Sequence, residues 1–265
     1  MKYSNQIYKY PRTEHIVGSK LQPGDEDMVN VPFSKIRGRN LVVEEKVDGA
    51  NSGISVIEDC LMLQSRGHYL TGGYRERHFD LFKTWANNYT QQFKDLLGEK
   101  YVMYSEWLYA KHTIFYDKLP HYNLEFDIYD TETGLYLDTP TRKQMLKPLP
   151  FVHSVKVLFE GKLDTKEDLY NFVGNSYFIS DEHKEKLSNL AKSQGLDSDK
   201  ILNETDLSGL MEGLYIKVEE DGVVKERYKF VRNEFLQTVS DSETHWLDRP
   251  IIPNQLVGTI DDLFI

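Results

Sequence analysis

The chain has 265 residues, of which 40% are hydrophobic and 28% charged, a composition typical of a folded globular protein and not of a disordered one. Its net charge of −10 argues against a protein that coats nucleic acid through bulk positive charge, while leaving a local basic groove open. One cysteine excludes an internal disulfide and a multi-thiolate metal site, and no apolar run approaches the roughly 20 residues of a membrane-spanning helix, so we expect a cytoplasmic protein without a membrane partner.

The first 40 residues are polar and rich in turn-forming residues, and we expect them to pack as an extension on the domain that follows. Residues 41–45 are predicted to form a strand that leads into a tight turn at Asp48-Gly49, and residues 53–57 and 61–64 form a hairpin. Between Tyr74 and Leu97 apolar residues recur at steps of three and four, which predicts one amphipathic helix. The same spacing favours core packing for its aromatic side chains over a base-stacking platform.

The second half of the chain continues the alternation of strands and short helices. Strands are predicted at 101–107, 122–129 and 152–159, helices at 166–173 and 181–193, and a late hairpin at 213–219 and 223–231. Because strands outnumber helices and are mostly joined by short turns, the predicted fold class is α+β, with largely antiparallel sheets flanked by helices.

No linker or repeat marks a boundary, so residues 1–265 are expected to form a single domain. Within it we distinguish the extension 1–40, a core of residues 41–232 and a C-terminal tail of residues 233–265. The tail is expected to pack back on the domain; the alternative is that it contacts a substrate through Asp241, His245, Trp246, Arg249 and Pro250.

Several charged residues lie inside or beside apolar strands, where a charge is costly unless it is paired or functional. Lys46 follows the strand at 41–45 and precedes the tight turn, which fixes its amine at a strand end. A lysine becomes nucleophilic when neighbouring cations and desolvation lower its pKa. Lys217, Arg227 and Lys229 are the candidates for such cations and for binding a polyphosphate, and the last two alternate on one face of a strand.

Other residues suggest a metal and a nucleotide. Glu106 and Glu212 are candidate ligands of a divalent metal, because carboxylate oxygens suit hard cations. Phe126 offers a flat face for a purine. The glycine-rich segment 67–73 lacks the ending of a P-loop, and beyond it Arg75, Arg77 and His78 either contact nucleic-acid phosphates or begin a solvated helix.

The order of these segments is more specific than any one of them. Lys46-Val47-Asp48-Gly49-Ala50-Asn51 resembles the K-x-(D/H)-G-x-(N/R) motif of the covalent nucleotidyltransferases, which include ATP-dependent DNA and RNA ligases and mRNA capping enzymes. The further matches follow in the order of that superfamily: Ser65-Arg66-Gly67, Tyr104-Ser105-Glu106-Trp107, Glu125-Phe126-Asp127-Ile128, Met211-Glu212-Gly213-Leu214-Tyr215-Ile216-Lys217 and Arg227-Tyr228-Lys229. Arg227 stands where lysine is usual. The resemblance spans residues 41–232 and is nearest to RNA ligases of the nick-sealing and RNA-repair kind.

The resemblance implies an ATP-grasp-like nucleotidyltransferase fold and an ATP-dependent RNA ligase. In such an enzyme Lys46 would form a lysyl-adenylate, AMP would pass to a 5′-phosphate end, and a 3′-hydroxyl would seal the strand. The implied ATP contacts are Glu45, Asp48, Asn51, Arg66, Glu106, Phe126, Lys217, Arg227 and Lys229. The implied metal is Mg²⁺ or Mn²⁺ on Glu212 and Glu106, and the implied partners are RNA ends or a nicked duplex.

The residues after Arg232 are too few for the OB domain of DNA ligases and capping enzymes, so none is expected. Two alternatives stay open. One is a capping-type guanylyltransferase that uses GTP at the same lysine. The other is a non-catalytic module that binds nucleotides or RNA ends.

Overall fold

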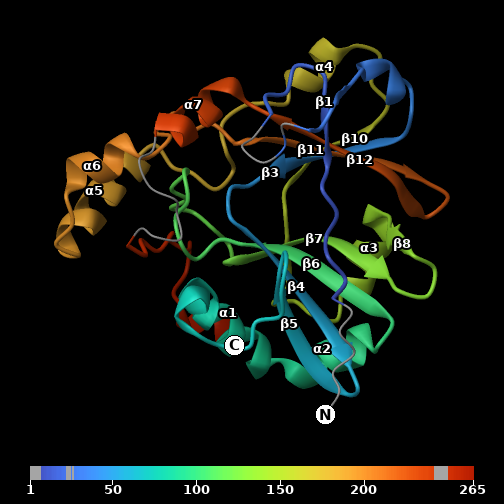
Figure 1. Cartoon of the computed structure of the whole chain (residues 1–265), viewed down its shortest axis with the longest axis horizontal. Helices are drawn as coiled ribbons and strands as arrows, with labels where there is room; N and C mark the ends of the chain where they lie inside the picture. The colour runs from blue at the N-terminus through green and yellow to red at the C-terminus, as the bar shows by residue number, and fades with distance from the viewer. Residues whose placement is uncertain (1–6, 22–24, 26, 242–249) are drawn as a thin grey trace.

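The computed structural model describes residues 7–21, 25, 27–241 and 250–265, with side chains described up to residue 238 in the last helix before the gap (Figure 1). Its centre is a sheet with the strand order β10-β3-β11-β12-β8-β7-β6-β4-β5. These strands are β10 (Val157–Gly161), β3 (Leu41–Lys46), β11 (Gly213–Glu220), β12 (Val223–Val231), β8 (Leu135–Leu137), β7 (Asn123–Asp130), β6 (Tyr101–Trp107), β4 (Ala50–Ile57) and β5 (Cys60–Ser65). All neighbours along this order are antiparallel, which confirms the predicted α+β class.

Three further strands join this sheet in parallel. β1 (Glu14–Ile16) pairs with β12 and with β2 (Asn30–Val31), and β9 (His153–Ser154) pairs with β7. The N-terminal segment, predicted only as a packed extension, therefore adds strands to the sheet, and β1 lies beside the strand that carries Arg227 and Lys229.

The aromatic stripe predicted between Tyr74 and Leu97 is buried, as expected for core packing. Phe82, Trp85 and Phe93 have no exposed surface. The single predicted helix is wrong in one respect: the chain forms η2 (Tyr74–Phe79), α1 (Asp80–Asn88) and α2 (Thr90–Leu97), with a break at Tyr89. Tyr89 leaves the helical conformation (φ −110°, ψ 25°) and its ring stacks on Phe151, so tertiary packing overrides the local pattern.

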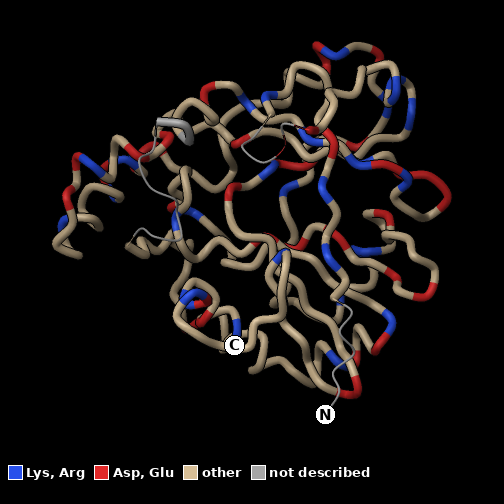
Figure 2. Tube along the Cα trace, viewed as in Figure 1, with Lys and Arg blue, Asp and Glu red and all other residues tan. Residues whose placement is uncertain are grey.

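The remaining helices lie around the sheet (Figure 1). They are η1 (Phe33–Lys35), α3 (Thr139–Leu146), α4 (Lys166–Tyr170), α5 (His183–Ser193), α6 (Ser198–Asn203), α7 (Asn233–Asp241) and η4 (Asp261–Phe264). None of the helices in the described ranges is long and apolar enough to cross a membrane. Lys and Arg are interspersed with Asp and Glu along the trace (Figure 2).

The described part of the C-terminal tail packs back on the domain, as predicted. Ile252, Asn254 and Leu263 are buried, and Asn254 bonds the backbone of Leu108 and Tyr116. His245 and Trp246 lie outside the described residues, so the structure does not test them as substrate contacts.

Candidate active site

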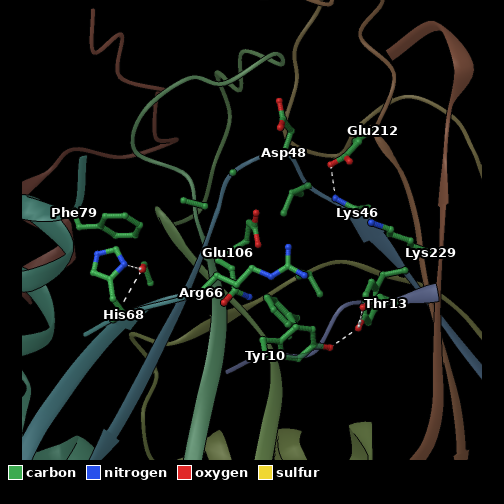
Figure 3. Close-up of a pocket in the computed structure, with 18 of the residues that line it drawn as sticks. Tyr10, Thr13, Lys46, Asp48, Arg66, His68, Phe79, Glu106, Glu212 and Lys229 are labelled. Atoms are coloured by element: carbon green, nitrogen blue, oxygen red, sulfur yellow. Dashed lines mark hydrogen bonds and ion pairs between the residues drawn. The ribbon is translucent and has the colours of Figure 1, made fainter. Parts of the chain in front are cut away.

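A cavity of about 1170 Å³ opens beside the strand end that carries Lys46 (Figure 3). Most of the predicted site residues line this cavity. They are Glu45, Lys46, Asp48, Asn51, Arg66, Glu106, Phe126, Glu212 and Lys229. The exceptions among the predicted residues are Lys217 and Arg227. The N-terminal segment, which sequence reasoning did not include in the site, contributes Tyr10, Pro11 and Thr13.

Strand register brings the motifs together. Lys46 at the end of β3 pairs with Gly213 on β11. Glu212, the residue before Gly213, therefore lies close to Lys46. Gly213 allows this approach: a Cβ there would lie 1.8 Å from the Phe230 carbonyl oxygen of β12. On the other side of the turn, Asn51 on β4 pairs with Glu106 on β6. A Cβ at Gly49 would lie 2.7 Å from the Trp107 carbonyl oxygen, so the turn between Lys46 and Asn51 also needs a glycine.

The charges that act most strongly on Lys46 are those of carboxylates and not those of the predicted cations, of which Lys229 is close enough to interact with it. Its ammonium forms an ion pair with Glu212 at 2.7 Å. Burial lowers the pKa of Lys46, but the charges of Glu212, Glu106 and Asp48 outweigh that effect and leave the pKa above its ordinary value. The prediction of a lowered pKa at Lys46 is therefore wrong, because the charged groups that act most strongly on the amine are negative.

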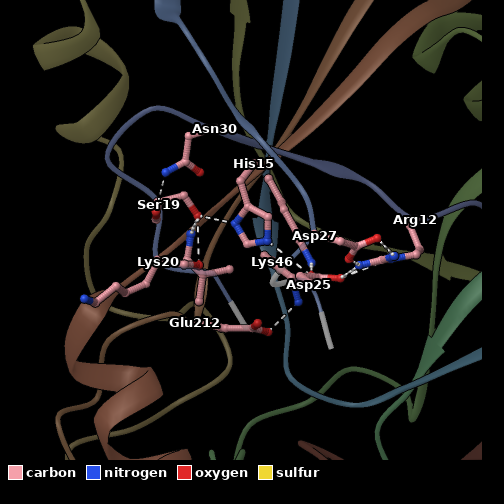
Figure 4. Close-up of polar contacts among 11 residues, drawn as sticks. Arg12, His15, Ser19, Lys20, Asp25, Asp27, Asn30, Lys46 and Glu212 are labelled. Atoms are coloured by element: carbon pink, nitrogen blue, oxygen red, sulfur yellow. Dashed lines mark hydrogen bonds and ion pairs between the residues drawn. The ribbon is translucent and has the colours of Figure 1, made fainter. Parts of the chain in front are cut away.

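The cation with the lowered pKa is Lys229. Burial lowers the pKa of Lys229, and the like charge of Lys46 lowers it further. Lys229 forms an ion pair with Asp25 at 2.5 Å, and Arg12 holds the other oxygen of Asp25 at 3.0 Å (Figure 4). His15 on β1 also contacts Asp25, at 3.2 Å. The N-terminal segment thus positions a cation of the cavity, which no local pattern in the sequence indicated.

The carboxylates near Lys46 make the cavity suitable for a cation. Burial raises the pKa of Glu106 to about 8, and Glu212 and Asp48 act in the same direction against Lys46. Burial also raises the pKa of Glu212. Asp48 accepts bonds from the backbone N–H groups of Thr113 and Ile114 and so is fixed in the turn.

Within the described ranges, no group of three or more His, Cys, Asp or Glu side chains forms a ready metal site. Two carboxylates suffice for Mg²⁺ when substrate phosphates complete its shell. Glu106 and Glu212 therefore fit a metal that arrives with a nucleotide. Burial raises the pKa values of both carboxylates, and a bound divalent cation would lower them.

Lys217 and Arg227 lie beneath the cavity instead of inside it. The ammonium of Lys217 is fully buried, forms ion pairs with Glu44 at 2.9 Å and Asp127 at 3.1 Å, and donates to the Phe126 carbonyl. The guanidinium of Arg227 lies 3.8 Å from the Tyr136 ring centroid. Arg227 does share a strand face with Lys229, but two residues along a strand displace it by about 6.6 Å, enough to leave the cavity. The sequence indicated that Arg227 and Lys229 share a strand face, but not that Arg227 lies outside the cavity.

An aromatic wall lies between this buried layer and the cavity. Phe126 is the extra residue of a β-bulge, since Tyr104 and Ser105 on β6 face Asp127 and Glu125 on β7. Bulges redirect a side chain, and here Phe126 reaches the cavity wall beside Tyr10 and Tyr215.

Arg66 and Glu45 occupy different surroundings in the cavity wall. Arg66 extends across the cavity toward the side that carries Lys46 and Lys229 (Figure 3). Within the described ranges Arg66 makes no ion pair with a carboxylate, so its charge is available to a ligand. Glu45 bonds the Ser176 hydroxyl at 2.5 Å and the Tyr177 N–H at 3.2 Å, and burial raises its pKa to about 7.

Comparison with solved structures supports the fold. A variant of the Naegleria gruberi RNA ligase with ATP and Mn matches with a TM-score of 0.56 at 18% identity, covering 89% of this chain and 59% of that chain. The same ligase with PPi matches with a TM-score of 0.52 at 18% identity, covering 90% of this chain and 62% of that one. A variant with AMP and Mn gives 0.54 at 18% identity, covering 87% and 57%. This chain spans about three fifths of the length of those proteins, and at this identity the likeness concerns the fold alone.

The comparison of sequences is more specific. No curated protein matches the chain significantly. The sequence model of the RNA ligase family, however, matches residues 39–231, which run from just before β3 to the end of β12. That range holds every motif from Lys46 to Lys229. Because the match covers most of the chain, this protein belongs to the RNA ligase family.

Proposed function

We propose that the chain is an ATP-dependent RNA ligase in which Lys46 carries the adenylate. The Lys46 Nζ attacks the α-phosphorus of ATP, a phosphoramidate N–P bond forms, and the bond to pyrophosphate breaks. AMP then passes from Lys46 to the 5′-phosphate of an RNA end, forming a pyrophosphate linkage and freeing the amine. A 3′-hydroxyl finally attacks that 5′-phosphorus, a phosphodiester forms, and AMP leaves.

The observation that carries this proposal is the position of Lys46 in a nucleotide-sized cavity between Glu212 and the other predicted site residues. Lys229 and Arg66 supply positive charge for the triphosphate, which is where phosphoryl transfer gains most of its rate. Phe126 supplies a ring for the adenine. Asn51 has a buried amide oxygen without a hydrogen-bond partner among the described residues, which suits a ligand donor.

The proton on Lys46 is the main obstacle to the first step, since an ammonium is not a nucleophile. Glu212 is the acceptor already in contact with it. Glu212 and Glu106 would hold the Mg²⁺ or Mn²⁺. A bound divalent cation neutralises phosphate charge and draws carboxylate charge away from Lys46, which lowers the pKa of the amine.

Labelling tests the first step directly. The protein is incubated with α-labelled ATP or GTP and Mg²⁺ or Mn²⁺, then denatured, and bound label is measured. We expect label from ATP that is acid-labile and sensitive to hydroxylamine, as a phosphoramidate is. Lys46→Ala should abolish it, whereas Lys192→Ala, a change at an exposed lysine of α5, should not.

The remaining outcomes separate the alternatives. Label from GTP alone indicates the capping-type guanylyltransferase, and no label from either nucleotide indicates a non-catalytic binding module. Label that persists in Lys46→Ala refutes Lys46 as the nucleophile. Sealing of a panel of labelled RNA and DNA ends then tests the second and third steps.

A further inference from the structure

Two exposed aromatic rings stand out against an otherwise buried aromatic set. Among the phenylalanine, tyrosine and tryptophan residues that the structure describes, two are exposed: Tyr74 at 79% and Tyr177 at 52%. Each has a cation over its ring: Arg77 lies 4.5 Å from the Tyr74 centroid, and Lys156 lies 4.8 Å from the Tyr177 centroid. Single exposed rings are common on protein surfaces, but each of these two is paired with a cation.

Tyr177 lies next to the active-site cavity through Glu45. The Glu45 carboxylate, adjacent to Lys46, bonds the backbone N–H of Tyr177, and the Glu45 N–H donates to the carbonyl of Lys156. Tyr177 also lines a second cavity of about 560 Å³, together with Lys118 and with Met211, which precedes Glu212. Met211 and Tyr177 thus link the lining of the second cavity, through adjacent residues and one hydrogen bond, to Glu212 and Glu45 of the first.

Tyr74 lies at the other end of the strand order, after β5, and lines the active-site cavity itself. Its position is fixed by the buried Glu76, which accepts bonds from the N–H groups of Thr71 and Gly72. Arg75 lines the same part of the cavity and is exposed. The predicted alternatives for this segment were phosphate contact and a solvated helix start, and its ring and cations together favour the first.

The charge beside Tyr177 suits an anionic strand. Lys118 and Lys156 are exposed, and in the part of the chain that the structure describes neither makes an ion pair with a carboxylate. A nucleotide presents a flat base beside a phosphate, which matches an exposed ring beside a cation. In a chain with a net charge of −10, such places are local and not part of a general basic surface.

We infer that Tyr74 with Arg77, and Tyr177 with Lys156, stack unpaired bases of RNA on either side of Lys46. This inference rests on the proposed function and adds the class of end that the enzyme takes: single-stranded RNA. Bases of a nicked duplex are already paired and stacked, so their faces are closed to a tyrosine, whereas unpaired bases bind aromatic rings readily.

Direct RNA binding tests the inference. Dissociation constants are measured at one fixed salt concentration for a labelled 5′-phosphorylated single strand and for a fully paired duplex of the same sequence. Tyr74→Ala and Tyr177→Ala are each expected to weaken binding of the single strand about tenfold, the effect of losing one stacked base. Tyr74→Phe and Tyr177→Phe keep the ring and should bind within about twofold of the wild type.

Leu135→Ala is the matched control, because Leu135 is an exposed apolar residue on β8 that lines neither cavity. It should bind both RNAs as the wild type does. The inference is overturned if either alanine variant binds the single strand like the wild type, if phenylalanine fails to restore binding, or if duplex binding weakens equally. Labelling of wild-type Lys46 with ATP needs no RNA and reports the proposed function separately. If Lys46 is labelled with ATP but both alanine variants bind RNA as the wild type does, this inference is refuted and the ligase proposal is not.

Discussion

A substitution of Lys217 distinguishes the role predicted from the sequence, phosphate binding, from the role indicated by the structure, a buried counterion. If Lys217 binds the phosphates of ATP, its loss impairs ATP use. If Lys217 is a buried counterion of Glu44 and Asp127, its loss leaves two buried carboxylates with one fewer positive charge. Lys217→Met keeps most of the volume and removes the charge. Breaking a buried ion pair in this way costs about 3–5 kcal/mol, which for a chain of this length lowers Tm by roughly 5–9 °C.

The assay combines thermal or urea unfolding with the KM for ATP in Lys46 labelling, measured well below the Tm of the variant. We expect the stability loss stated above and a KM within about twofold of the wild type, the range of an indirect effect. Lys225→Ala is the control: this lysine of β12 is partly exposed and, within the described residues, its one ion pair is with Asp221 at 3.3 Å, so about 0.5 kcal/mol is expected. Unchanged stability together with a tenfold higher KM would show that Lys217 binds the phosphates and would refute its role as a buried counterion.

Two further changes test other parts of the site. Burial raises the pKa of Glu106 from 4.5 to about 8, so the folded chain retains a proton that the unfolded chain releases. That contribution to stability is present below about pH 4.5 and is lost as the pH rises through about 8; the free energy of unfolding of Glu106→Gln should therefore fall less over this range, and equal slopes would contradict the assignment. Gly213→Ala should lower stability by about 3 kcal/mol or more, because its Cβ would meet the Phe230 carbonyl at 1.8 Å. Gly174→Ala, with open space around its Cβ, should change the midpoint of unfolding little, and similar losses in both variants would argue against the clash.

Local patterns predicted most of the elements that position the site. The alternation of residues 213–231 gave the hairpin of β11 and β12, and the strand and turn around Lys46 were confirmed. The strand predicted at 152–159 forms instead as β9 and β10, interrupted at Val155 and Lys156, because β9 pairs with β7 and β10 with β3. Alternation cannot show which partner a strand will take, since pairing depends on residues far away in the chain.

The sequence by itself determined the candidate site residues: the lysine before a tight turn, the carboxylates on strands and the order of the motifs are all local properties of the chain. The tertiary structure alone decided how deep each charge lies and which charges meet. Lys217 and Lys229 look alike in sequence, yet one neutralises buried carboxylates and the other faces the cavity beside Asp25. The reason is physical: the pKa and the role of a charged group depend on desolvation and on neighbours that folding brings from distant segments.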